Sequence, residues 1–138
     1  MITWQQIRDR VHASYAVERE EPTWLGLSIP GAPETRIRVL LVSAAGALHV
    51  RVAADLGDEA ALSYRQALLY NRTLVTGALA LEPTGRYILC CQRALERATT
   101  DDVGALVDGI IREVALIAIA RRRDADPTDP IALAMYAD

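Results

Sequence analysis

The sequence predicts a single α+β domain in the order α-β-β-β-α-β-β-α, with a five-stranded, mainly antiparallel sheet. Three observations predict it. The length of 138 residues is that of one ordinary domain. Apolar residues recur with helical periodicity in three segments, and the segments between them alternate apolar and polar residues as strands do. The strand-like segments follow one another through short turns, which favours hairpins over βαβ units.

The first element is predicted to be an amphipathic helix from about Ile2 to Glu20, which ends before Pro22. Its apolar positions have helical spacing: Trp4, Ile7, Val11 and Tyr15. Three strands are expected next, separated by turns rich in Gly, Ala and Pro: Thr23–Ile29, Thr35–Val42 and Ala47–Ala54. Each of the last two alternates charged and aliphatic residues, so the two form a hairpin with one buried face.

The second half of the sequence is predicted to contain a helix, a hairpin and a final helix. A second helix is predicted from Asp58 to about Arg72, followed by a hairpin of Leu74–Leu81 and Arg86–Arg93. Gly85 is available for positive φ in the turn between those strands. The third helix is expected to begin at Thr99 or Thr100, since Thr99 and Asp102 have capping-box spacing. Its broad apolar stripe consists of Val103, Leu106, Val107, Ile110, Ile111, Val114 and Ile117.

The domain is predicted to cover residues 1–123, with a C-terminal tail at 124–138 that contains a short helical turn around Ile131–Met135. Arg121–Arg123 would lie at the C-terminus of the third helix, where cations complement the helix dipole. The first residues lack the pattern of a signal peptide and the longest apolar stretches are too short to span a bilayer, so we expect neither feature; the only cysteines, Cys90 and Cys91, are adjacent. Together these features favour a reducing, cytoplasmic location.

Few residue patterns in the sequence are typical of a catalytic or metal-binding site. Cys90 or Cys91 with His12 or His49 is the one conceivable nucleophile and base pair, and mid-strand cysteines are the alternative. Three carboxylates could hold a hard cation or belong to a solvated tail: Asp124, Asp126 and Asp129. We therefore predict no catalytic residues, no metal and no cofactor.

The arginines could form a basic surface that binds phosphate or nucleic acid. Arg121–Arg123 could grip phosphate, and four strand arginines could extend a basic surface over the sheet: Arg36, Arg38, Arg51 and Arg86. The net charge of −3 disfavours nonspecific binding of nucleic acid. A nucleic-acid-associated accessory protein is therefore the alternative function.

Apolar strand residues support a protein-binding function instead. The first and third helices cover only one face of the sheet, and the strands carry more apolar positions than that layer requires: Leu25, Leu27, Ile29, Ile88 and Cys90. Uncovered apolar surface marks an interaction site. A self-contained core covered in part by the tail is the alternative interpretation.

The segment from Asn71 to Leu89 resembles the type III secretion chaperone-like superfamily, which includes the class I effector chaperones and the YbjN family of regulators. In both, a helix ends in Asn, a short apolar link leads to Gly, and a hairpin follows, here Ala80-Leu81-Glu82-Pro83-Thr84-Gly85. A polar linker and a long final helix come next, as Thr99 to Arg123 does here.

This resemblance implies a small, homodimeric, non-catalytic protein that binds an extended stretch of a client, either as an effector chaperone or as a regulator. It implies a dimer interface on the second helix or on an exposed strand, with Leu62, Arg65, Gln66 and Leu69 as the candidate residues. Client binding is expected on the sheet and first helix, through Trp4, Ile7, Leu27, Ile29, Ile88 and Cys90.

Overall fold

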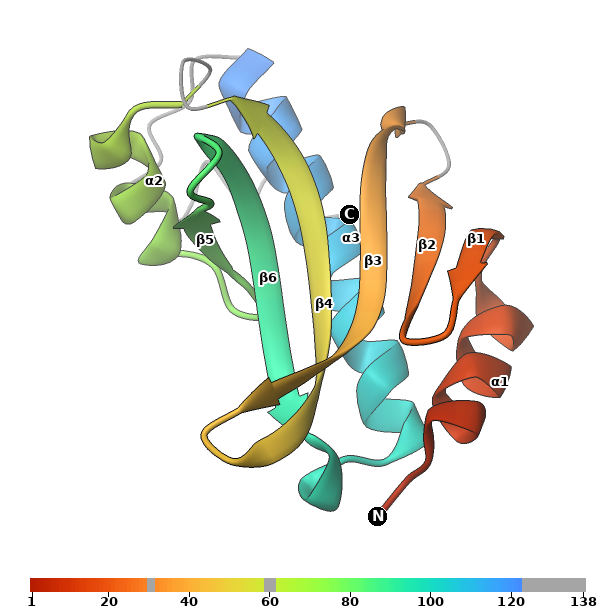
Figure 1. The fold of residues 1–138 in the computed structure, drawn as a ribbon. Coiled ribbons are helices and arrows are strands. Elements are labelled where there is room, and N and C mark those ends of the chain that lie inside the picture. Colours follow the sequence, from red (N-terminus) through yellow and green to blue (C-terminus); the bar gives the residue numbers. More distant parts are fainter. Residues whose placement is uncertain (30–31, 59–61, 123–138) are drawn as a thin grey trace.

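The computed structural model describes residues 1–29, 32–58 and 62–122. These residues form three α-helices, one 3-10 turn and a six-stranded antiparallel sheet in the order β1-β2-β3-β4-β6-β5 (Figure 1). The elements are α1 Trp4–Ser14, β1 Val17–Glu21, β2 Trp24–Ile29, β3 Ala32–Ala44, β4 Ala47–Asp58, α2 Tyr64–Asn71, β5 Ala78–Leu81, β6 Arg86–Ala94, η2 Leu95–Arg97 and α3 Thr100–Arg122. The predicted α+β class is confirmed, with one strand more than predicted.

The additional strand is β1, which the sequence interpretation placed inside the first helix. The helix ends at Ser14 because Tyr15 turns to extended backbone, and the Tyr15 hydroxyl donates to Gly104 O at 3.2 Å and contacts Asp108. The next residues then pair with β2 in an antiparallel hairpin. The helical spacing of Trp4, Ile7 and Val11 predicted the helix correctly. Tyr15 has the same spacing but lies outside the helix, because its side chain contacts α3.

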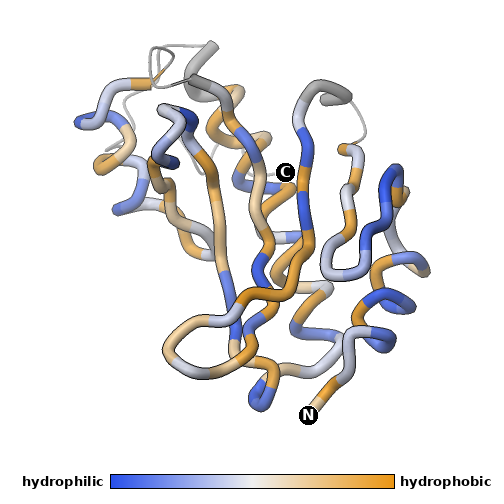
Figure 2. The backbone as a smooth tube through the Cα atoms, viewed as in Figure 1, coloured by the Kyte–Doolittle hydropathy of each residue, from blue (hydrophilic) through white to orange (hydrophobic). Residues whose placement is uncertain are grey.

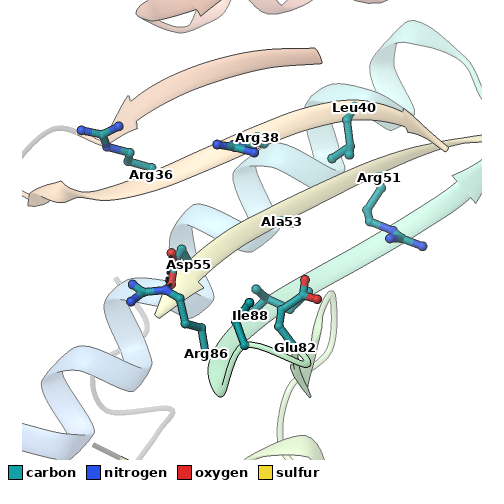
Figure 3. Close-up of a pocket in the computed structure, with 10 residues that line it drawn as sticks. Arg36, Arg38, Leu40, Arg51, Ala53, Asp55, Glu82, Arg86 and Ile88 are labelled. Atoms are coloured by element: carbon teal, nitrogen blue, oxygen red, sulfur yellow. Dashed lines mark hydrogen bonds and ion pairs between the residues drawn. The ribbon is translucent and has the colours of Figure 1, made fainter. Parts of the chain in front are cut away.

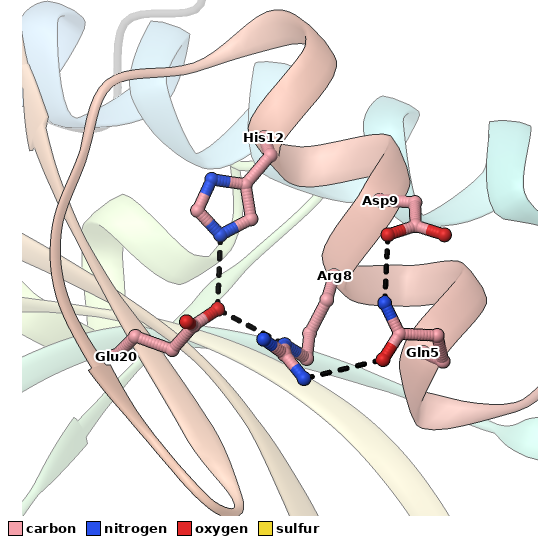
Figure 4. Close-up of polar contacts among 5 residues, drawn as sticks. All are labelled: Gln5, Arg8, Asp9, His12 and Glu20. Atoms are coloured by element: carbon pink, nitrogen blue, oxygen red, sulfur yellow. Dashed lines mark hydrogen bonds and ion pairs between the residues drawn. The ribbon is translucent and has the colours of Figure 1, made fainter.

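A polar contact holds α1 against the new strand (Figure 4). Glu20 of β1 accepts a hydrogen bond from Arg8 Nε at 2.9 Å, and His12 Nε2 lies 2.9 Å from the same oxygen. These bonds from His12 and Arg8 lower the pKa of Glu20. The strand that the sequence missed is thus attached to the helix that precedes it.

The hydrophobic core lies between the sheet and the layer formed by α1 and α3. We call the sheet surface toward these helices the inner face. Figure 2 shows apolar residues along the central strands and along α3. The largest fully buried side chains come from α1, α3 and the four strands β2, β3, β4 and β6: Ile7, Val11, Leu25, Leu27, Ile37, Val39, Val50, Val52, Leu89, Val103, Ile110 and Ile117. The predicted apolar stripe of the third helix is therefore confirmed.

Two of the predicted turns and the cap of the third helix are confirmed. Ala45 and Gly46 connect β3 to β4 with φ of 51° and 78°, and Gly85 connects β5 to β6 with φ of 85°. At the start of α3, Asp102 N–H donates to Thr99 Oγ1 at 3.1 Å and Thr99 N–H donates to Asp102 Oδ2 at 2.9 Å. This reciprocal pair is the capping box that the Thr99 and Asp102 spacing predicted.

Several boundaries differ from the prediction; β3, for example, runs from Ala32 to Ala44 and not from Thr35 to Val42. The second helix begins at Tyr64 and not at Asp58, because β4 continues to Asp58 and Ser63 forms a capping box with Gln66. The strand β5 begins at Ala78 and not at Leu74, because the preceding backbone is held by α3. Arg123 and the predicted tail, with its turn at Ile131–Met135, lie outside the described residues.

Candidate protein-binding surface

The cysteines do not form a nucleophilic centre with either histidine. Burial raises the pKa of Cys90 and raises the pKa of Cys91 to about 12, whereas a nucleophilic cysteine requires a lowered pKa. Cys90 pairs with Ala53 across β4, and His49 lies four residues from Ala53 along that strand, a distance of ~13 Å. Cys91 lies on the opposite, inner face. His49 is therefore not placed to act as a base for either thiol, and His12 instead contacts Glu20 at 2.9 Å.

Neither a metal site nor a membrane-spanning helix is found in the part of the chain that the structure describes. No three His, Cys, Asp or Glu side chains converge there, and no helix there is both long and apolar enough to cross a bilayer. Asp124, Asp126 and Asp129, the carboxylates that could hold a cation, lie outside the described residues.

The sheet surface opposite the helices, which we call the outer face, has no helical layer over it among the described residues (Figure 1). Side chains of β3, β4 and β6 enclose a hollow of about 370 Å³ on this face, with Leu40, Ala53 and Ile88 among its apolar lining (Figure 3). We call it the outer hollow. Leu40, Ala53 and Ile88 are each partly exposed, so the structure leaves apolar surface available in a concave site.

Four arginines surround this apolar centre: Arg36, Arg38, Arg51 and Arg86. The structure therefore confirms that the strand arginines named by the sequence share one surface. Two carboxylates, Asp55 and Glu82, line the same hollow. The side chains of Arg121 and Arg122, and all of Arg123, lie outside the described part of the chain, so the proposed extension of the surface to them is not tested.

Only one of the four arginines is neutralised by a carboxylate of the described chain. Arg86 Nε donates to Asp55 Oδ2 at 2.9 Å. Burial alone would raise the pKa of Asp55, but the hydrogen bonds from Arg86 and from Gly57 N–H lower it. Asp55 therefore stays ionised and holds Arg86 at one end of the outer hollow.

Two other arginines are positioned by neutral groups. The Arg38 guanidinium lies 4.3 Å from the centre of the Trp24 ring, and Arg19 contacts the same ring at 5.2 Å. Arg51 Nε and Nη2 donate to Gln92 Oε1 at 3.0 and 2.7 Å. A π-system and an amide orient these guanidiniums without cancelling their charge.

Gly26 makes the first arrangement possible. It lies between Arg19 and Arg38 in the cross-strand row, and a Cβ there would lie 3.3 Å from Trp24 Cζ3. The absence of a side chain lets the indole lie against the strand with an arginine on each side. The sequence analysis did not identify Trp24 or Gly26, although their alternation with buried Leu25 and Leu27 places both on the outer face.

A second apolar surface lies on α2 and β5 at the end of the sheet. Its large side chains are strongly exposed, with Tyr64 at 60% and Leu68 at 68%, and Leu81 of β5 is exposed as well. The edge strand next to α2 is closed by Asn71, whose amide accepts from Leu79 N–H at 2.6 Å and donates to Leu79 O at 3.2 Å. This surface can meet a partner through side chains, while the backbone of Leu79 is already paired.

The structure separates the predicted client-binding residues into two groups. Ile7, Leu27 and Ile29 lie in the core with 0, 2 and 8% exposure, because the inner face packs on α1 and α3. The interpretation of Leu25, Leu27 and Ile29 as surplus surface is therefore wrong. Ile88 and Cys90 lie partly exposed on the outer face, and Trp4 is partly buried against the core.

The residues predicted for the dimer interface also differ in their exposure. Leu62 is buried in the core, Leu69 is partly buried, and Arg65 and Gln66 are exposed on α2. Tyr64 and Leu68, the most exposed apolar residues of this helix, were missed. Their signal was present in the sequence, since Tyr64 and Leu68 are four residues apart and share one face of a helix.

Comparisons of sequence and of structure give different results. No protein-family model and no curated protein matches the sequence. Several solved structures do match the fold. The ExsC–ExsE complex aligns with a TM-score of 0.59 at 15% identity, over 86% of this chain and 90% of the other. The HopA1–SchA chaperone–effector complex gives 0.54 at 11% identity, over 78% and 85%.

A third neighbour is the Yersinia pestis type III secretion chaperone SycH in complex with a fragment of YscM2, with a TM-score of 0.53 at 10% identity, over 80% and 95% of the two chains. The chain has the fold of the type III secretion chaperones. The resemblance stated from Asn71 to Leu89 is therefore confirmed for the fold. In this chaperone-like fold, Asn71 has a structural role, because it closes the edge of β5.

Proposed function

We propose that this chain is a non-catalytic, homodimeric protein-binding module that takes an extended segment of a client protein on the outer face. The observation that carries the proposal is the outer hollow: a concave site on an uncovered sheet face, with Leu40, Ala53 and Ile88 as its apolar centre. Apolar surface that the described chain leaves exposed is typical of interaction sites. The client would be a secreted effector or a regulatory protein.

The structural neighbours support this proposal. The solved complexes of SchA and SycH each pair a chaperone of this fold with another protein. Of the residues predicted for client binding, Ile88 and Cys90 are those that remain accessible on the outer face. For self-association, α2 offers exposed Tyr64 and Leu68.

Replacement of Ile88 by Asp tests the client-binding surface. An array of unstructured peptides of about 15 residues provides the probe, because extended segments bind sheets through side-chain pockets. We expect Ile88→Asp to weaken the binding of every peptide that the wild type retains, since it places a charge in the apolar centre of the hollow. Peptide binding is measured on the array, and circular dichroism checks the fold.

The matched control is Leu48→Asp, which introduces the same charge at an exposed leucine of the β3–β4 hairpin, outside the outer hollow. This variant should retain wild-type binding. Equal peptide binding by Ile88→Asp and the wild type would contradict the assignment of the outer face as the client site.

A further inference from the structure

We propose that the outer hollow selects client segments in which carboxylates flank apolar side chains. This inference rests on the proposed function and specifies the chemistry of the partner. Its basis is the combination of a basic rim with an apolar centre on a chain whose net charge is −3. On a chain with a negative net charge, a local cluster of arginines makes one surface positive. Such a surface favours a ligand of opposite charge.

The rim holds three arginines without an ion pair in the described chain, and of these the charge of Arg38 contributes to the lowered pKa of Asp55. Arg36, Arg38 and Arg51 form no ion pair with any described carboxylate, whereas Arg86 is paired with Asp55. Arg38 and Arg51 are nevertheless held in place, by the Trp24 ring and by Gln92. Guanidiniums that are oriented and unpaired are suited to bidentate binding of carboxylates, and the ordering cost of the side chains is already met within the fold.

The spacing of the rim suits an extended peptide. Arg36, Arg38 and Leu40 are alternate residues of β3 and point to the same face, so neighbouring members are about 6.6 Å apart along the strand. An extended client segment has the same rise, so two carboxylates and one apolar side chain at alternate positions match them in order. Arg51 lies beside Leu40, directly opposite it on β4, and provides a third cation next to this apolar side chain.

The same features argue against nucleic acid as the occupant. Proteins that bind single-stranded nucleic acid without sequence preference use aromatic platforms for the bases, and the ring of Trp24 already has Arg19 and Arg38 against it. The apolar centre of Leu40, Ala53 and Ile88 fits side chains of a peptide better than a phosphate backbone.

The test compares three fluorescein-labelled probes by anisotropy. The first is an acidic peptide of about 12 residues with Val and Leu at its centre and Asp or Glu on both sides. The second carries Asn and Gln in place of every Asp and Glu, and the third is a single-stranded DNA oligonucleotide. We expect the acidic peptide to bind at least about tenfold more tightly than its neutral counterpart, with an advantage that falls as salt rises.

The double variant Arg36→Gln with Arg51→Gln should remove that advantage. The matched control, Arg97→Gln with Arg112→Gln, changes the net charge equally at two exposed arginines outside the hollow and should keep it. Arg36→Gln alone, at a side chain with no hydrogen bond to the described chain, should give a smaller loss without affecting the fold. Thermal unfolding of each variant separates loss of binding from loss of structure.

The possible results distinguish this inference from the function on which it rests. If both peptides bind equally and Ile88→Asp weakens both, the chain binds proteins but the selectivity for acidic segments is refuted. If neither peptide binds, both proposals are refuted. Tighter binding of the oligonucleotide, lost in Arg36→Gln with Arg51→Gln, would overturn the proposal in favour of a nucleic-acid surface.

Discussion

At the scale of single residues, Ala45 occupies a conformation that is costly for a residue with a Cβ. It shares the β3–β4 turn with Gly46, and both residues have positive φ. This geometry matches the twist of an antiparallel hairpin, and Asn-Gly is the sequence that accommodates it best. The left-handed region costs a non-glycine residue roughly 1–2 kcal/mol, which Asn offsets by hydrogen bonding locally.

Ala45→Asn should therefore raise the free energy of unfolding by about 0.5–1 kcal/mol. Urea denaturation followed by circular dichroism measures the change. Ser43→Asn, two residues earlier on β3 where the backbone is already extended, serves as the control and should not stabilise the chain. A decrease in stability for Ala45→Asn would show that the turn does not have this geometry in solution.

Residue patterns of short range were predictable from the sequence, and contacts of long range were not. Thr99 and Asp102 are three positions apart, so their capping box is visible as a spacing. Ile88 and Leu27 look alike as apolar strand residues, but one lies on the outer face and the other in the core. Periodicity shows that a strand has two faces; it does not show which face the helices cover.

At the scale of elements, α3 holds the segment between α2 and β5 through one buried carboxylate. Glu113 is 3% exposed and accepts three backbone hydrogen bonds, from Val75 N–H at 2.7 Å, Thr76 N–H at 3.2 Å and Gly77 N–H at 2.6 Å. Consecutive amide groups provide the positive environment that a buried carboxylate requires. This contact fixes where β5 begins, which explains why the predicted start at Leu74 was too early.

Glu113→Gln should lower the free energy of unfolding by about 2–4 kcal/mol, because the new amide group turns donors toward buried N–H groups. Chemical denaturation measures the loss, and hydrogen exchange should be accelerated first at Val75, Thr76 and Gly77. Glu96→Gln, at an exposed residue of η2, is the control and should change stability little. Unchanged exchange at these three amides would contradict the role assigned to Glu113.

The first strand shows what limited the prediction of elements. Val17 to Glu21 contains four charged residues and one apolar residue, so it carries neither the alternation of a half-buried strand nor a strong helical pattern. It becomes a strand because β2 pairs with it and because Arg8 and His12 of α1 hold Glu20. Its structure is determined by its neighbours in space.

At the scale of the whole molecule, the exposed apolar side chains of α2 predict self-association. Leu68→Asp should convert a dimer of about twice 15.1 kDa into a monomer, because it places a charge in the centre of the proposed interface. Light scattering coupled to size exclusion measures the mass. Leu48→Asp, at an exposed leucine on the β3–β4 hairpin, should remain dimeric, and a wild-type monomer would refute this part of the proposed function.

The pairing of Asn71 with Leu79 has a consequence for how copies of this chain can accumulate. Sheets with exposed backbone at an edge can template one another, and a head-to-tail contact that does not close grows into a filament. An incoming strand at β5 would meet the Asn71 amide where it needs the Leu79 N–H and carbonyl. At Leu79, therefore, a single side chain already occupies the backbone groups through which another copy would add a strand.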